Sequence, residues 1–167
     1  MPLVRLFLDL CLFKKGPQDM PASMMLLKLA LLAYFLVGMA LTVLETDWLE
    51  GVLQVLLEGA MLFGFVWISL IAAEKTHRWL QTSIAMLGTD ALISSFAIPL
   101  KIVLLADPQA GLIYLLLLLL MLWHIGVVAH ILRHALSQTL AVGLGLSIVY
   151  VFFSLQVLIL LFGTPSA

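Results

Sequence analysis

The sequence predicts an all-α polytopic membrane protein with five transmembrane helices and a short amphipathic N-terminal helix. Of its 167 residues, 64% are apolar and only 10% are charged. The apolar residues gather in stretches of about 20, the length that a helix needs to cross a bilayer. A soluble domain is roughly 45–50% apolar and about 25% charged, and one of this length has too little interior for so many apolar side chains. Soluble enzymes, disordered chains and disulfide-stapled modules are therefore excluded.

The first element, residues 1–22, is predicted to be a cytoplasmic amphipathic segment. Apolar residues recur there at mixed helical spacing, and Arg5 and Asp9 are four residues apart. Lys14 and Lys15 follow the apolar run, whereas a signal peptide has its basic residues first. A helix lying at the membrane interface fits this pattern, and a helix packed against the floor of the bundle fits it equally well.

Residues 23–163 are predicted to form a single five-helix transmembrane domain. Ser23 precedes the first apolar stretch and is a suitable helix cap. Short turns with charged residues separate the stretches, and Pro99 is expected to kink the third one. The predicted spans are 24–44, 51–73, 80–103, 112–132 and 140–162.

The distribution of lysine and arginine predicts the orientation of the chain. If five helices alternate from a cytoplasmic N-terminus, every Lys and Arg except Lys101 falls on the cytoplasmic side. This asymmetry follows the positive-inside rule. We therefore expect a cytoplasmic N-terminus and an external C-terminus, in a bacterial inner membrane.

Polar residues on the third span form one narrow line. Ionisable groups at bilayer depth are costly, so each of them requires an explanation. At 100° per residue, the polar side chains of this span fall within roughly 40° of one another. They are Ser83, Asp90, Ser94 and Lys101.

A second polar stripe runs along the second span, where Glu50, Gln54 and Glu58 repeat every four residues. Helical rise places Asp90 near the membrane midplane, and His124 on the fourth span reaches nearly the same depth. The depths allow a hydrogen bond between Asp90 and His124, and a contact between Glu58 and Lys101.

Three interpretations compete for this candidate cluster, which consists of Glu58, Asp90, Ser94, Lys101 and His124. The polar side chains can join the helices through hydrogen bonds, they can form a proton or ion path, or they can line a cavity for a small substrate. The chain shows neither inverted repeats nor paired broken helices, which are common in transporters. The structural interpretation is therefore preferred.

No enzyme, metal or cofactor is predicted. His130 and His134 are one helical turn apart, but Arg133 lies beside them and the glutamate of a zinc-protease motif is missing. The net charge of −1 does not suggest nucleic acid as a partner. Cys11 is the only cysteine and has no internal disulfide partner.

Small residues at helical spacing are expected to mark close contacts between helices. Ala60 and Gly64 are four residues apart, as are Ala141 and Gly145. In the fifth span, a further set of small or polar residues shares one face: Gly143, Ser147, Tyr150 and Ser154.

The second half of the chain carries four stretches of a recognisable pattern: 88–92 (GTDAL), 98–100 (IPL), 122–127 (LWHIGV) and 134–141 (HALSQTLA). Together they resemble the Yip1-domain family. The resemblance implies five spans, a cytoplasmic N-terminus, a proline late in the third span and a basic or histidine-containing loop before the last. The D-L-Y-G-P motif of the eukaryotic members is absent, and the resemblance transfers no site residues.

These observations favour an integral membrane scaffold or accessory subunit that acts through helix packing. Its expected partners are the lipid bilayer and either a membrane protein or a second copy of the chain. The alternative is a small transporter, or a proton- or ion-conducting protein, that uses Glu58, Asp90, Lys101 and His124.

Overall fold

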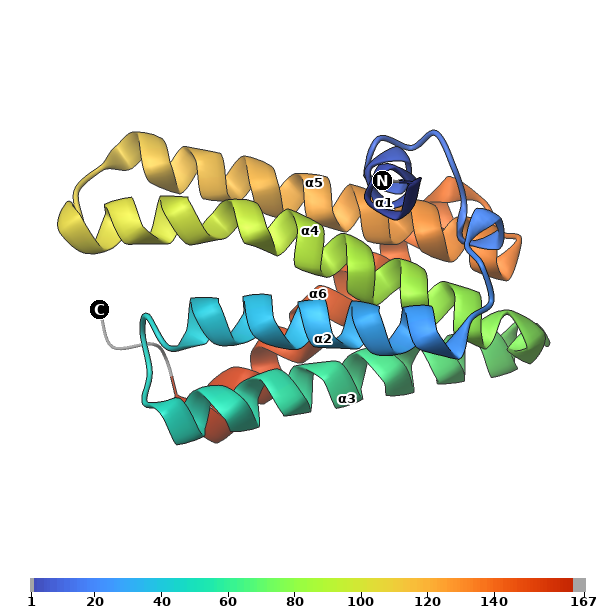
Figure 1. Cartoon of the computed structure of the whole chain (residues 1–167), viewed down its shortest axis with the longest axis horizontal. Coiled ribbons are helices and arrows are strands. Elements are labelled where there is room, and N and C mark those ends of the chain that lie inside the picture. Colours follow the sequence, from blue (N-terminus) through green and yellow to red (C-terminus); the bar gives the residue numbers. More distant parts are fainter. Residues whose placement is uncertain (1, 164–167) are drawn as a thin grey trace.

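The computed structural model describes residues 2–163, which are helical apart from turns (Figure 1). Five of the helices, α2 to α6, are long and apolar enough to cross a membrane. The predicted all-helical fold is confirmed, and the chain fits a multi-pass membrane protein. The elements are α1 (Pro2–Cys11), η1 (Pro17–Asp19), α2 (Met24–Thr42), α3 (Trp48–Ala72), η2 (Thr76–Arg78), α4 (Trp79–Ala106), α5 (Gly111–Leu136) and α6 (Leu140–Phe162).

The helix boundaries follow the predicted spans within a few residues. Ser23 caps α2 as expected, because its Oγ accepts a hydrogen bond from the Leu26 N–H at 3.4 Å. Helix α3 begins three residues earlier than its predicted span, and α4 continues through Pro99 to Ala106. The span prediction counts only residues at hydrocarbon depth, whereas the helical hydrogen bonds continue beyond it.

The five long helices run alternately in opposite directions, so their turns collect at two ends of the bundle (Figure 1). The acidic end comprises the turns 43–47 and 107–110 together with Gly163. The basic end comprises the turns 73–78 and 137–139. Glu45, Asp47 and Asp107 lie at the acidic end, and Arg78 lies at the basic end.

The packed core lies in the half of the bundle next to the basic end. Helix α4 packs against α2 and α5, and α5 packs against α6. Residues 82–89 of α4 and 127–132 of α5 are all buried. By contrast, most residues between 112 and 122 of α5, toward the acidic end, are exposed. The same pair of helices is therefore tightly enclosed at one end and loosely enclosed at the other.

Gly143, which belongs to the face of small and polar residues noted in the fifth span, allows a close approach between two helix backbones. A Cβ at Gly143 would collide with the carbonyl oxygen of Ala129 on α5. A Cβ at Gly64 or Gly145 would meet nothing within 4 Å. The expected contacts at these two glycines are wrong, because a four-residue spacing does not determine which helix face meets a neighbour.

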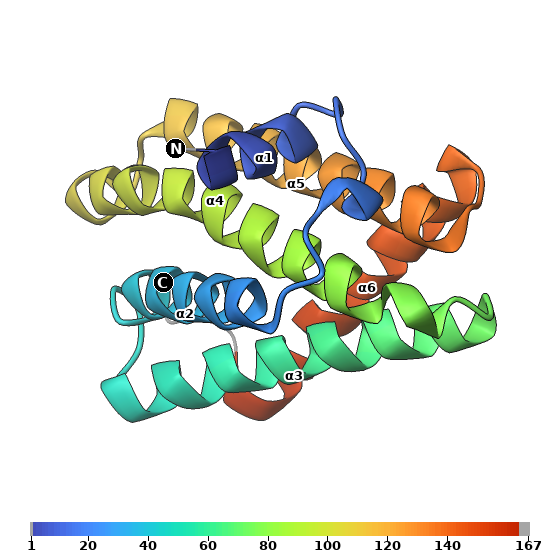
Figure 2. The same ribbon diagram turned by 45° about the vertical axis from the view of Figure 1, so that its right-hand side comes forward.

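The N-terminal helix α1 lies across the flank of α4 and α5 (Figure 2). The Phe7 ring occupies the space beside Gly88, and the Trp123 indole donates to the Cys11 carbonyl at 3.0 Å. Further along, the His130 Nε2 lies 2.9 Å from the Lys15 carbonyl oxygen. The segment therefore packs against the bundle, on its flank and not on its floor. Its position at the membrane interface stays a prediction.

Cys11 is buried where α1 packs against α4 and α5. Its side chain is fully buried, and burial raises the pKa of its thiol to about 12. A thiol that stays protonated is a poor nucleophile. We therefore expect the native cysteine to be inert toward thiol reagents in the folded protein.

Candidate functional site: an intramembrane polar cavity

A cavity of about 460 Å³ lies among all five long helices. It receives all five residues of the candidate cluster predicted from the sequence. Asp90, Ser94 and Lys101 come from α4, Glu58 from α3 and His124 from α5. Residues of α2 and α6 complete the wall.

The deepest polar contact in the cavity joins α4 to α5. The His124 Nε2 lies 3.0 Å from the Asp90 Oδ1, which confirms the contact expected from their depths. By helical rise, His124 lies about 18–20 Å from either end of α5. The side chains of Asp90 and His124 keep 20% and 25% of their surface exposed. An acid–base pair that can exchange a proton therefore lies near the middle of the bundle and is accessible from the cavity.

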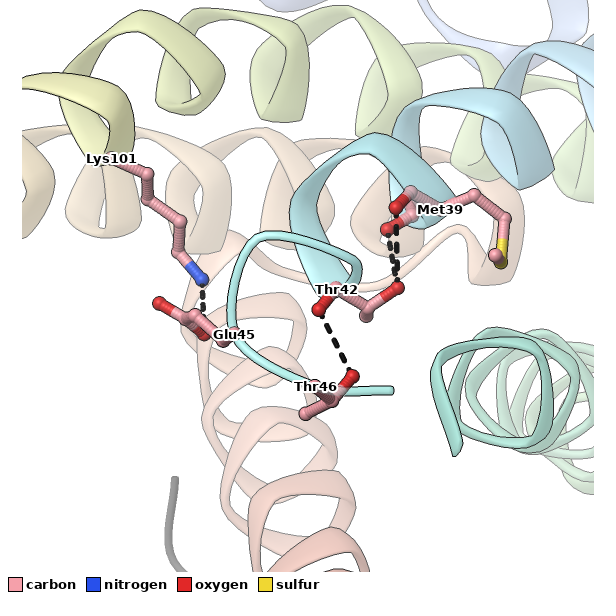
Figure 3. A network of polar contacts seen from close by, with 6 residues as sticks. Met39, Thr42, Glu45, Thr46 and Lys101 are labelled. Carbon is pink, nitrogen blue, oxygen red and sulfur yellow. Dashed lines mark hydrogen bonds and ion pairs between the residues drawn. The ribbon is translucent and has the colours of Figure 1, made fainter. Parts of the chain in front are cut away.

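Lys101 lies toward the acidic end and pairs with a residue other than the expected one. Its Nζ lies 2.7 Å from the Glu45 Oε2. Figure 3 marks this contact between the two side chains with a dashed line. The expected contact between Lys101 and Glu58 is absent from the ion pairs of residues 2–163. Glu45 reaches the lysine from the turn after α2, a position that depth estimates for the spans did not consider.

Local hydrogen bonds fix the turn that carries Glu45 (Figure 3). The Thr42 Oγ1 donates to the Gly38 carbonyl oxygen at 3.1 Å, and the Thr46 Oγ1 donates to the Thr42 carbonyl oxygen at 2.9 Å. The Thr42 carbonyl oxygen also accepts hydrogen bonds from the backbone N–H groups of Glu45 at 3.0 Å and Thr46 at 2.9 Å. The ion pair with Lys101 therefore projects from an ordered turn.

Several polar groups that line the cavity have no partner within residues 2–163. Neither an ion pair nor a hydrogen bond engages the Glu58 carboxyl group, and the same holds for the hydroxyls of Ser94, Tyr34 and Tyr150. Polar groups inside a protein are nearly always hydrogen-bonded to protein or to water. The cavity is therefore built to hold water or a polar solute.

Acidic side chains outnumber basic ones in the lining of the cavity. Glu45, Glu58 and Asp90 face one lysine and one histidine. Both bases are engaged, Lys101 by Glu45 and His124 by Asp90. Glu58 is left as the carboxyl group without a counter-ion among the described residues, so the site favours a proton or a cation over an anion.

Two residues of the predicted stripes lie outside the cavity. Ser83 is fully buried in the core, and its Oγ has no hydrogen-bond partner among the described residues. Glu50 lies nearer the acidic end, where its Oε1 accepts a hydrogen bond from the Gln54 Nε2 at 3.1 Å. Of the polar line on α4, Ser83 therefore lies in the packed core, whereas Asp90, Ser94 and Lys101 line the cavity.

Sequence reasoning missed Tyr34 and Glu45 as parts of the site. Tyr34 lies within an apolar span, where its hydroxyl gives no periodic signal. Tyr150 belongs to the face of α6 noted from the sequence and also lines the cavity. The two tyrosines are 7% and 8% exposed, so only a small part of each is left to face the cavity.

Comparisons with family models, with curated proteins and with solved structures find no significant match to this chain. The resemblance to the Yip1-domain family stays a prediction. The site is therefore interpreted from its own residues.

Proposed function

We propose that the protein moves protons or a small cation across the membrane, with the cavity as the access path from the acidic end. The observation that carries the proposal is the Glu58 carboxyl group, which faces a polar cavity with no partner within residues 2–163. Ionisable groups at bilayer depth are costly and commonly mark ion or proton pathways. In this proposal Glu58 takes up the proton or cation.

The Asp90–His124 pair serves as the inner exchange site. Carboxylate and imidazole groups at 3.0 Å can share a proton, and histidine titrates near neutral pH in water. The ion pair of Lys101 and Glu45 lies at the outer part of the same cavity, where it would hold α4 to the end of α2. Each charged side chain of the candidate cluster then has a role.

Transport requires the packed half of the bundle to rearrange. Apolar residues without exposed surface lie between the cavity and the basic end, among them Val66, Ile84, Leu87, Val127 and Ile131. In this proposal, the structure represents a state in which the cavity is open toward the acidic end and closed toward the basic end. Alternation between two such states is the usual route for membrane transporters.

The proposal includes an orientation and a location. The excess of Lys and Arg at the basic end supports a cytoplasmic position for that end, in a bacterial inner membrane. Single cysteines introduced by Thr46→Cys and Pro108→Cys should react with an impermeant reagent from outside. A cysteine introduced by Thr76→Cys should react only from inside, and its labelling from outside would reverse the orientation.

Flux measurements in proteoliposomes test the function. Purified protein is reconstituted with a pH-sensitive dye inside, a potassium diffusion potential is imposed, and proton entry is recorded. The same vesicles are then tested with sodium and potassium gradients. Glu58→Gln should lower the flux by about tenfold or more, the scale of a lost proton-transfer group. Glu50→Gln is the matched control, because Glu50 lies on the same helix outside the cavity.

The scaffold or accessory-subunit interpretation is the alternative, and it predicts the opposite result. Vesicles that contain the protein would then show the same proton and cation flux as empty vesicles. Crosslinking in native membranes would instead recover a constant membrane-protein partner or a second copy of the chain. Equal flux in the Glu58→Gln and parent proteins would likewise contradict the proposed role of Glu58.

A further inference from the structure

A second cavity, of about 540 Å³, lies at the basic end and is separate from the intramembrane cavity. It forms where the turn before α4 meets the turn between α5 and α6. The side chains around it include Arg78, Arg133 and His134, together with Ser137, Gln138 and Thr139. None of the residues that line it is acidic.

Arg78 is held in place by the end of α5. Its Nη1 donates to the carbonyl oxygens of His134 at 3.0 Å and Ala135 at 3.1 Å, and to the Ser137 Oγ at 3.0 Å. These bonds neutralise the negative end of the α5 dipole. No other nitrogen of the Arg78 guanidinium group is engaged within residues 2–163.

Arg133 has neither an ion pair nor a side-chain hydrogen bond among the described residues. Asp19 follows Gln18 of the cavity wall in the chain, and its Oδ2 accepts a hydrogen bond from the Gly16 N–H at 2.8 Å. The guanidinium group of Arg133 is thus available to a ligand in a pocket that already holds a second arginine.

The turn between α5 and α6 adds hydrogen-bond donors to this pocket. Ser137 adopts a left-handed conformation with φ of 53°, which ends α5 and lets α6 begin at Leu140. The Thr139 Oγ1 accepts from the Val142 N–H at 3.4 Å. The N–H groups of Leu140 and Ala141 have no partner within the described residues, and they lie at the positive end of the α6 dipole.

We propose that the cavity bounded by Arg78, Arg133 and Thr139 at the basic end binds a phosphate group. Arginine binds phosphate oxygens through paired N–H groups, and the N-terminus of a helix adds favourable amides. The site lies where membrane helices end, at the level of lipid headgroups, so an anionic phospholipid can supply the phosphate. A soluble phosphate compound can supply the same chemistry. The proposal does not depend on the function assigned to the intramembrane cavity.

Thermal unfolding of the purified full chain in detergent tests the proposal. Three probes are titrated separately: dihexanoyl phosphatidylglycerol, dihexanoyl phosphatidylcholine and inorganic phosphate. We expect phosphatidylglycerol to raise the Tm in a saturable way and phosphatidylcholine to have no such effect. An equal saturable rise with inorganic phosphate would identify a soluble phosphate compound as the source of the ligand.

Two variants and one control locate the site. Arg133→Gln should raise the half-saturating concentration of phosphatidylglycerol about fivefold, the scale of one lost basic contact near a membrane surface. Gln138→Glu places a carboxylate in the same pocket on an exposed turn and should weaken binding at least as much. Lys75→Gln removes one charge from the same end but outside the cavity, and should leave the half-saturating concentration within about twofold of the parent.

Two results would overturn the proposal. One is the absence of a saturable rise in Tm with either anionic probe. The other is a rise whose half-saturating concentration is the same in the parent, Arg133→Gln and Gln138→Glu proteins. Because Gln138 is exposed and outside the packed core, its variant keeps the test valid even if Arg133→Gln does not fold.

Discussion

The two halves of the bundle use the same five helices for different purposes. Toward the basic end, residues 82–89 of α4 and 127–132 of α5 are buried without interruption. Toward the acidic end, the same two helices line a cavity that contains Asp90, Lys101 and His124. Packing in the first half gives a closed, apolar core, whereas the second half keeps polar groups accessible at bilayer depth.

The difference between the halves has identifiable local causes. Gly143 lets α6 approach the backbone of α5 near Ala129, and the Phe7 ring packs beside Gly88 on the flank of α4. Both contacts lie in the closed half. In the open half, the polar side chains of the cavity require solvent, which opposes further closure of the helices.

Truncation of a core leucine should produce the largest effect and confirm which half carries the stability. Leu87 is fully buried in α4, and Leu105 on the same helix is 57% exposed. Leu87→Ala should lower the free energy of unfolding by about 2–5 kcal/mol, because it leaves a cavity in the core. Leu105→Ala should cost less than about 1 kcal/mol. If unfolding experiments in detergent give the same loss of unfolding free energy for both variants, the two halves do not differ in packing.

The second effect concerns the contact between α5 and α6. Gly143→Ala should lower stability by about 1–3 kcal/mol, because the added methyl group collides with the Ala129 carbonyl oxygen. Gly145→Ala, two residues further along the same helix, should be neutral or slightly stabilising, since nothing lies within 4 Å. The measurement is the Tm of each variant relative to the Tm of the parent protein. Similar losses for both variants would show that α6 packs through another face.

Asp90 should show a smaller effect on stability and a large effect on transport. Asp90→Leu removes the hydrogen bond to His124 and should cost about 1 kcal/mol, the scale of interhelical hydrogen bonds in membranes. Asp90→Asn keeps a hydrogen-bonding group and should leave the Tm nearly unchanged while it abolishes proton flux. If the Asp90→Asn protein shows the same proton flux as the parent, Asp90 has only a structural role.

The sequence predicts the helices well because their signals are local. Apolar stretches of the required length and the capping serine at Ser23 define the elements without knowledge of their neighbours. The helix faces that meet are determined by rotations and crossing angles that no single span encodes. The expected contacts at Gly64 and Gly145 were therefore wrong, whereas Gly143, on the face of small and polar residues noted in the fifth span, does meet the backbone of α5.

Contacts in the candidate site were predictable where they depend only on the depth of two residues along neighbouring helices. Asp90 and His124 lie at the same level on neighbouring helices, and the structure joins them. The partner of Lys101 was not predictable in this way, because Glu45 lies in the turn between α2 and α3, outside the predicted spans. Likewise, Ser83 and Ser94 share a face of α4, but only the packing of the other helices separates a buried serine from one that lines the cavity.

Cysteine accessibility at these two serines tests most directly the claim that the bundle is open in one half and closed in the other. The native Cys11 is buried and its thiol pKa is raised to about 12, so we expect it to add little to the labelling of the folded protein. We predict that Ser94→Cys reacts readily with a small, water-soluble, charged methanethiosulfonate, while Ser83→Cys does not react until the protein is unfolded. If Ser94→Cys reacts as slowly as Ser83→Cys in the folded protein, the cavity is not accessible to water and the account is wrong.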